Sequence, residues 1–299
     1  MKFVITGGAG FIGSHIAKYL VSNNHHVTIV DNLSRGRLEN LSKIKDQIEF
    51  KKIDILDFDS LEKIVCNCDG IFHQAALTSV PESFLEKEKY HNVNVNGTEN
   101  IFKLAKEFKT KVVYASSSSI YGNTTLIPIQ ENFEKNPINP YGVTKLDDEK
   151  LAEKYHDLGV SIIGLRYFNV YGIGQTNDYA GVITKFIDQI NLNKSPIIFG
   201  DGTHTRDFIS VEDIAKANLL SMESKTDFSF LNVGTGISTS IKELAEVMIE
   251  LSGKKMEISY DDLPLGDVKD SLADVSLAKR LINWTYETSL KTGLKKFFF

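Results

Sequence analysis

A glycine-rich turn near the start of the chain is the feature that most limits how this sequence folds. Residues 6–13 read Thr-Gly-Gly-Ala-Gly-Phe-Ile-Gly, directly after the β-branched run Lys2–Thr6 and directly before a helical pattern. Gly7, Gly10 and Gly13 permit a tight turn, a close approach of backbone N–H groups to a phosphate, and close packing of helix on strand. The positive end of the helix dipole lies at the same place. The turn therefore predicts a βα unit that binds the pyrophosphate of a dinucleotide.

An acidic residue ends the second expected strand, His26–Asp31, and stands 18 residues beyond Gly13. A carboxylate there accepts hydrogen bonds from the adenosine ribose and repels a 2′-phosphate, so Asp31 favours NAD over NADP. Arg35, four residues further on, is the residue that argues for NADP. A glycine-rich turn that binds no ligand is the remaining interpretation.

The first half of the chain alternates short apolar runs with helical patterns. The expected strands are Lys2–Thr6, His26–Asp31, Ile48–Ile53, Gly70–His73, Lys111–Ser116 and Val160–Arg166. Apolar strands separated by helices are typical of a parallel sheet covered on both faces, so we predict a doubly wound α/β fold of Rossmann type. We expect an NAD-binding domain over residues 1–171 and a smaller, mixed α/β substrate lobe over residues 172–299, with the strand near 229–233 returning to the first sheet.

The overall charge argues for a small-molecule ligand. The chain of 299 residues has a formal net charge of −5, and 24% of its residues are charged, without a basic block for nucleic acid or an acidic membrane. Cys66 and Cys68 are too close in sequence for an ordinary disulfide and too few for a zinc site. No apolar run reaches the ~18 residues that span a bilayer. We expect a cytoplasmic protein with no metal, nucleic-acid or membrane partner.

Tyr141 and Lys145 form the candidate reaction centre. They are four residues apart, so in a helix they share one face. An ammonium beside a phenol favours the phenolate, which can take a proton from a sugar hydroxyl. Alone, this spacing is more typical of the edge of an amphipathic helix. Behind a dinucleotide motif it predicts an acid–base pair.

The glycine turn and the Tyr141-x-x-x-Lys145 pair together resemble the extended short-chain dehydrogenase/reductase superfamily. The similarity continues through Asp54-Ile55, His73-Gln74-Ala75-Ala76 and residues 94–98, Asn-Val-Asn-Gly-Thr. For Phe168 two interpretations are equally good, a contact with the cofactor and packing in the core. The resemblance implies bound NAD, contacted by Gly7, Gly10, Phe11, Ile12, Gly13, Asp31, Asn32, Ser34, Asp54, Ile55, Gln74, Ala75, Ala76, Asn94, Tyr141, Lys145 and Phe168.

The serine run 116–119 lies at the carboxyl edge of the expected sheet, where open α/β sheets bind ligands. By the resemblance, Ser117 is the catalytic serine, and sugar dehydratases carry an Asp-Glu pair at the next two positions. Here those positions hold Ser118 and Ser119, which provide no carboxyl acid or base to expel water. Dehydration is therefore disfavoured, and decarboxylation is weakened because that branch uses a glutamate at the position of Ser119. The remaining resemblance is to the nucleotide-sugar 4-epimerases, the family of UDP-galactose 4-epimerase, and it implies a transient 4-keto sugar.

The same resemblance assigns residues that hold the nucleotide sugar. Asn169 would contact the sugar nucleotide, Phe199 would lie beside the uracil, and Arg206 would bind the diphosphate with its fork of donors. Asp267 matches a ribose contact, whereas Pro264 stands where many members carry a second diphosphate arginine.

Ser271 matches the position that lines the sugar pocket, where a tyrosine restricts family members to plain hexoses. A serine leaves room for a C2 acetamido group, so the resemblance implies UDP-glucose/UDP-galactose and the N-acetylhexosamine pair as substrates.

Two other functions stay open, as does the assembly. One is an NAD-dependent nucleotide-sugar oxidoreductase that releases its reduced cofactor, and the other is a non-catalytic NAD-binding regulatory protein. Since family members usually dimerise through two helices per subunit, we expect a homodimer through the helical stretches Tyr90–Phe108 and Pro140–Leu158.

Overall fold

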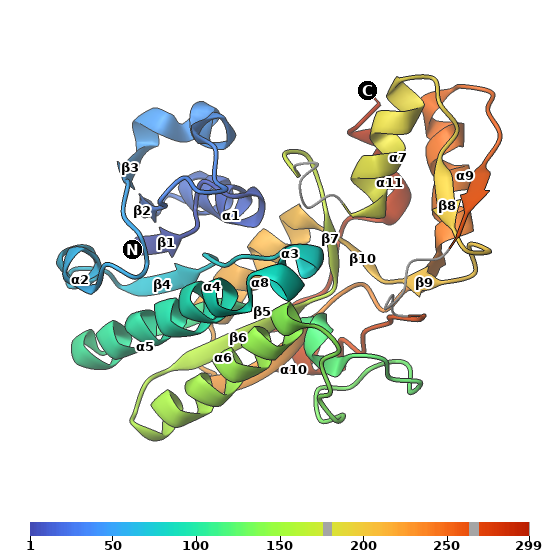
Figure 1. Cartoon of the computed structure of the whole chain (residues 1–299). Helices are drawn as coiled ribbons and strands as arrows, with labels where there is room; N and C mark the ends of the chain where they lie inside the picture. The colour runs from blue at the N-terminus through green and yellow to red at the C-terminus, as the bar shows by residue number, and fades with distance from the viewer. Residues whose placement is uncertain (176–180, 263–268, 299) are drawn as a thin grey trace.

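A seven-stranded parallel sheet is the frame of the structure, a computed structural model that describes residues 1–175, 181–262 and 269–298 (Figure 1). Its strand order is β11-β6-β5-β4-β1-β2-β3. The structure confirms the predicted doubly wound fold: every expected strand of the first half is present, two of them with the predicted ends and the others with ends shifted by one or two residues. The strands are β1 (Lys2–Thr6), β2 (His26–Val30), β3 (Ile48–Lys51), β4 (Gly70–His73), β5 (Lys111–Ser117), β6 (Ile162–Tyr167) and β11 (Phe228–Val233).

Helices cover both faces of this sheet. Successive residues of a strand point to opposite faces, so Phe3 and Ile5 of β1 pack into one apolar cluster and Val4 packs into the other. Within the described ranges no helix is both long and apolar enough to cross a membrane. The first cluster is covered by α1 (Phe11–Ser22), η1 (Leu38–Gln47), α8 (Val211–Glu223) and α10 (Ser276–Ile282), the second by α2 (Phe58–Val65), α5 (Gly97–Phe108) and α6 (Pro140–Asp157).

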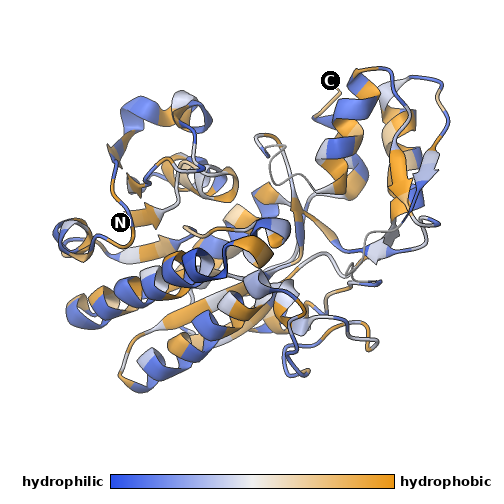
Figure 2. Ribbon diagram, viewed as in Figure 1, coloured by the Kyte–Doolittle hydropathy of each residue, from blue (hydrophilic) through white to orange (hydrophobic). Residues whose placement is uncertain are grey.

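A second lobe lies beyond the carboxyl ends of β5 and β6 in Figure 1. Its apolar cluster joins three helices to a two-stranded sheet, and Figure 2 shows apolar residues along β8. The elements are α7 (Val182–Asn191), β8 (Ile197–Phe199), α9 (Ile241–Ser252), β13 (Ser259–Asp261) and α11 (Leu290–Lys295).

Short strand pairs connect this lobe to the large sheet. Parallel β7 (Asn169–Tyr171) and β10 (Phe208–Ser210) form one pair, and antiparallel β9 (Thr205–Arg206) and β12 (Thr239–Ser240) form the other. β11 then pairs with β6 along its whole length, from Phe228 opposite Ile162 to Val233 opposite Tyr167. The chain therefore passes through the second lobe and returns to the large sheet.

The strand order reverses between β1 and β4, because β2 and β3 follow on one side and β5 and β6 on the other. A crevice at the carboxyl ends of these two strands is the usual ligand site of such a sheet. The link from β4 to α5 crosses this end of the sheet through α3 (Val80–Leu85), α4 (Lys87–His91) and η2 (Asn92–Asn96). The loop after β5 begins with η3 (Ser118–Tyr121).

Candidate active site

The glycine turn between β1 and α1 combines a backbone conformation that other residues rarely adopt with contacts too close for a side chain. Gly7 has φ +68°, and a Cβ there would lie 2.7 Å from the Ala75 backbone nitrogen at the end of β4. A Cβ on Gly13 would lie 2.3 Å from the Gly7 carbonyl oxygen. The glycine turn is therefore packed tightly against the end of β4. The first residues of α1, which include Phe11 and Ile12, have backbone N–H groups without acceptors inside the helix. This is a cradle for a phosphate.

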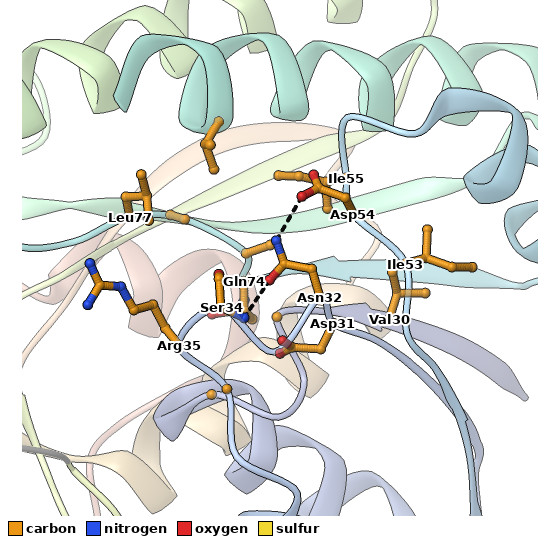
Figure 3. A pocket seen from close by; sticks show the side chains of 16 residues that line it. Val30, Asp31, Asn32, Ser34, Arg35, Ile53, Asp54, Ile55, Gln74 and Leu77 are labelled. Carbon is orange, nitrogen blue, oxygen red and sulfur yellow. Dashed lines mark hydrogen bonds between the residues drawn. The ribbon is translucent and has the colours of Figure 1, made fainter. Parts of the chain in front are cut away.

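A pocket opens beside this turn, and ten of the residues assigned to the cofactor line it (Figure 3). Asp31 lies at the end of β2, where Ala9 N–H donates to Oδ2 at 3.0 Å and Leu33 N–H donates to Oδ1 at 2.8 Å. Burial raises the pKa of Asp31, and these two bonds oppose the rise. The ten residues are Gly7, Gly10, Asp31, Asn32, Ser34, Asp54, Ile55, Gln74, Ala75 and Ala76.

Hydrogen bonds fix the polar wall of this pocket. The Asn32 side-chain amide donates to Asp54 Oδ2 at 2.8 Å, and its oxygen accepts from Ser34 N–H at 2.9 Å (Figure 3). Asp54 Oδ1 accepts a further bond from Leu56 N–H. The pocket therefore presents oriented acceptors beside the apolar Ile55, as an adenosine requires.

Arg35 lines the same pocket, but its guanidinium faces an acid. Its Nη2 donates to both oxygens of Glu82, at 2.6 and 2.8 Å, and Glu82 Oε2 also accepts from the Tyr90 hydroxyl at 3.0 Å. A 2′-phosphate in this pocket would approach the Asp31 carboxylate. The ion pair with Glu82 engages the Arg35 guanidinium, which weakens the argument for NADP.

Asn94 and His73 are buried and do not line the pocket. Asn94 is fully buried; its oxygen accepts from Leu77 N–H at 2.8 Å, and its amide donates to the Leu77 carbonyl and to Thr144 Oγ1. His73 lies between Thr6 and Thr98, at 2.6 and 2.9 Å, and burial lowers its pKa to about 3. A neutral imidazole therefore supports the floor of the site.

The reaction centre lies at the start of α6. Asn139 caps the helix by accepting from Gly142 N–H at 2.8 Å, and Pro140 occupies the first turn, so Tyr141 stands at the very beginning of the helix. A Cβ on Gly142 would lie 2.9 Å from the Ser119 carbonyl oxygen. Gly142 therefore allows the loop after β5 to contact α6 directly beside Tyr141.

This contact brings Ser117 to the same corner of the molecule. The Ser117 oxygen accepts from Ser119 Oγ at 2.9 Å and from Ser119 N–H at 3.2 Å, which leaves its own hydroxyl proton for a third partner. Tyr141 is half-buried, whereas Lys145 is 3% exposed and donates to Asp148 Oδ2 at 3.1 Å. Tyr141 and Lys145 thus lie on the helix that contacts the loop after β5, and this loop begins beside Ser117.

A buried arginine at the end of β6 ties these elements together, and the sequence analysis did not single it out. Arg166 donates through Nε and Nη2 to the two oxygens of Glu149 on α6, both at 2.8 Å. Its Nη1 donates to the Tyr121 hydroxyl, which in turn donates to Asn232 on β11. Ser116 donates to the same Glu149. The sequence does hold a signal for this contact, because Arg166 is a charged residue within an otherwise apolar strand and a buried cation needs a partner.

A second cavity, of about 860 Å³, lies between β7, β10 and α7, and it has the volume of a small-molecule site. Asn169, Phe199 and Arg206 line it, as does the 5% exposed Phe168. Arg206 Nη1 donates to the carbonyls of Thr205 at 2.8 Å and Lys269 at 3.1 Å. Three side chains assigned to the sugar nucleotide therefore do share one cavity.

Ser271 lies on a segment bonded to the strand that carries Arg206. Its N–H donates to the Thr205 carbonyl at 3.2 Å, and its side chain is 8% exposed. Asp207 fixes the same segment by accepting from Ala273 N–H at 3.1 Å and from Thr235 N–H at 2.7 Å. Asp267 and Pro264 lie outside the described residues.

Comparisons with known proteins identify the family of this chain and solved structures with the same fold. The model of the NAD-dependent epimerase/dehydratase family matches residues 3–234. A putative UDP-glucose 4-epimerase of Methanocaldococcus jannaschii is 41% identical, over 98% of this chain and 96% of that protein. The structure of a UDP-N-acetylglucosamine 4-epimerase from Methanobrevibacter ruminantium, in complex with UDP-N-acetylmuramic acid, has a TM-score of 0.95 and 39% identity, covering 99% of this chain and 96% of that one. A UDP-glucuronic acid 4-epimerase from Bacillus cereus, bound to UDP-glucuronic acid and NAD, has a TM-score of 0.91 and 32% identity, covering 99% and 97%.

Proposed function

Because this chain belongs to the NAD-dependent epimerase/dehydratase family, we propose that it is an NAD-dependent UDP-sugar 4-epimerase. Its substrates are UDP-glucose and UDP-galactose together with their N-acetylated counterparts. The observation that carries the proposal is the contact between the loop after Ser117 and the start of the helix that carries Tyr141 and Lys145, in a chain that also has the pocket beside Asp31 and the cavity beside Arg206. Ser118 and Ser119, without carboxyl groups, limit this site to the removal and return of one proton.

The residues fit NAD at the glycine turn and at Asp31. The closely packed turn over β4 leaves N–H groups of α1 for the pyrophosphate, and Asp31 and Asn32 present acceptors to the ribose and adenine end. When bound, NAD supplies the acceptor and donor of hydride at C4 of the sugar.

The chain's own residues then handle the proton. Tyr141 takes it from the C4 hydroxyl and returns it after the 4-keto sugar has turned over. The Lys145 ammonium stabilises the phenolate, and the Ser117 hydroxyl donates a hydrogen bond to the same sugar oxygen without giving up its proton. Asn169, Phe199 and Arg206 hold the nucleotide, with Arg206 on the diphosphate.

Ser271 supports the inclusion of N-acetylated sugars. Its segment is bonded to the strand that carries Arg206, so the side chain lies at the sugar end of the nucleotide cavity in our proposal. A serine at that point does not clash with an acetamido group as a tyrosine would.

Two measurements on the purified protein test the proposal. A panel of UDP- and dTDP-sugars, followed by chromatography of the products, is expected to show reversible interconversion at C4 without added cofactor. Acid denaturation of the protein is expected to release about one NAD per chain, because an epimerase regenerates its cofactor in each cycle. Release of stoichiometric NADH during turnover would indicate a net oxidoreductase, and NAD binding without turnover would indicate a regulatory protein.

We also propose a homodimer that forms through α5 and α6. Val143 on α6 is exposed, and Phe84 and Leu85 on α3, which packs against α6, are exposed as well. Apolar side chains beside two helices suit an isologous four-helix contact. Light scattering at micromolar concentration is expected to give the mass of two chains; the 33.5 kDa mass of one chain would contradict this. A cytoplasmic location stays a prediction from the sequence.

A further inference from the structure

The helix that carries Tyr141 and Lys145 also carries a buried acid that the proposed reaction does not use. Asp148 is 0% exposed, and its Oδ2 accepts from Lys145 Nζ at 3.1 Å. Moving two charges out of water costs free energy that their attraction alone often does not recover. A buried pair in the reaction centre therefore calls for a functional explanation.

The second oxygen of this carboxyl group has no hydrogen-bond partner among the described residues. A pair built for stability alone would satisfy both oxygens, because an unpaired buried carboxylate oxygen is costly. Burial raises the pKa of Asp148 to about 7, against the opposing effect of the Lys145 ammonium. The carboxyl group thus gains and loses its proton near neutral pH.

Groups from several neighbouring elements act on this pair or lie close to it. His73 on β4 is neutral, because burial and the Lys145 charge lower its pKa to about 3. Burial raises the pKa of Tyr114 on β5, so it stays a phenol. The remaining groups are Thr98 on α5 and Asp147, which pairs with Lys150 at the surface, while the Arg166–Glu149 pair acts on Tyr114.

We propose that Asp148 is a positioning residue whose carboxylate anchors the Lys145 ammonium beside Tyr141, and that protonation of this carboxylate releases the anchor. A buried ammonium without a counter-ion loses its proton more easily, because the charged form is poorly solvated. The Asp148 carboxylate therefore holds the Lys145 ammonium in place. The inference rests on the proposed function in one respect, the role of Tyr141 as the base.

The test compares the unmutated protein with Asp148→Asn, because an asparagine has the shape of the protonated acid and lacks the charge. At pH 6 the two proteins are expected to have similar kcat/KM, since Asp148 is protonated there. Above pH 7 the unmutated protein gains the carboxylate, and its kcat/KM is expected to exceed that of the variant by about tenfold at pH 9. A ratio that stays constant from pH 6 to pH 9, or that favours the variant at pH 9, overturns the inference.

Asp147→Asn is the matched control. Asp147 forms the same type of i,i+3 ion pair on the same helix, with Lys150 at 2.8 Å, but this pair lies at the surface. Its loss is expected to leave kcat/KM at pH 9 unchanged and, because the Asp147 charge raises the pKa of Asp148, to move the rise in kcat/KM only slightly toward lower pH. A pH-dependent loss in both variants would mean that any charge on α6 acts at long range, and would overturn the role of the buried pair.

Urea unfolding over the same pH range tests the pair without reference to activity. An aspartate in the unfolded chain has a pKa of about 3.9, so the folded protein binds this proton more tightly than the unfolded chain. The stability of the unmutated protein relative to Asp148→Asn is therefore expected to fall as the pH rises from about 4 to about 7 and to stay level above that. A difference that does not vary with pH overturns the inference. Absence of turnover on any sugar would reject the proposed function. In that case the urea unfolding measurement alone would decide the inference.

Discussion

Tyr141→Phe is expected to lower kcat for UDP-sugar interconversion by at least about 100-fold, the usual contribution of a general base. The substitution removes one oxygen from a half-buried ring at the first turn of α6 and keeps the ring itself. The helix cap at Asn139 and the pocket beside Asp31 are unaffected, so the variant is expected to retain its fold and its NAD. Steady-state kinetics and the NAD released on denaturation measure the two effects separately.

Tyr155→Phe is the matched control for this loss. Tyr155 lies on the same helix, and its hydroxyl donates to Glu99 at 3.3 Å, far from the loop after β5. Removing that hydroxyl is expected to leave kcat close to normal. Near-normal turnover by Tyr141→Phe would remove the base from the mechanism, and equal losses in the two variants would assign the effect to the stability of α6.

Ser271→Tyr is expected to narrow the range of sugars. A tyrosine adds an aromatic ring at the proposed sugar end of the cavity, where a C2 acetamido group needs space. The fall in kcat/KM is expected to be at least about tenfold greater for the N-acetylated pair than for UDP-glucose and UDP-galactose. Initial rates with the four substrates measure this difference.

Ser271→Ala separates size from polarity in the same pocket. The backbone bond from residue 271 to Thr205 remains in both variants, so the segment is expected to keep its place. The alanine variant leaves the space open, and it is expected to turn over all four sugars at similar rates. A proportionate loss on both pairs of sugars in Ser271→Tyr would show that this residue does not guard the pocket.

The sequence predicted the parts of the site that depend on local chemistry. The glycine turn and Asp31 lie within one βα unit and its next strand, where backbone conformation and strand order leave few alternatives. Tyr141 and Lys145 are neighbours on one helix for the same reason. The resemblance to a family extended these assignments to Asn169 and to other residues of the second lobe.

Contacts between distant segments could not be predicted in this way. Arg35 follows the expected NAD motif, and only the fold places Glu82 opposite its guanidinium. The burial of charged pairs could not be predicted either. Lys145–Asp148 and Asp147–Lys150 have the same spacing on the same helix, yet the first pair is buried and the second lies at the surface. The helical pattern of α6 does not distinguish the two, because the packing of α5 and β5 decides which face is covered.

The return of β11 to the large sheet also has a consequence for how the protein is made. Until residues 228–233 have left the ribosome, β6 is an edge strand with a row of unpaired backbone groups along an apolar segment. The nascent chain must therefore keep this edge from pairing with other chains while the second lobe is still being synthesised. A fragment that ends at residue 171 would keep the cofactor pocket and leave the same edge open, so we expect it to aggregate rather than to bind NAD as an isolated domain.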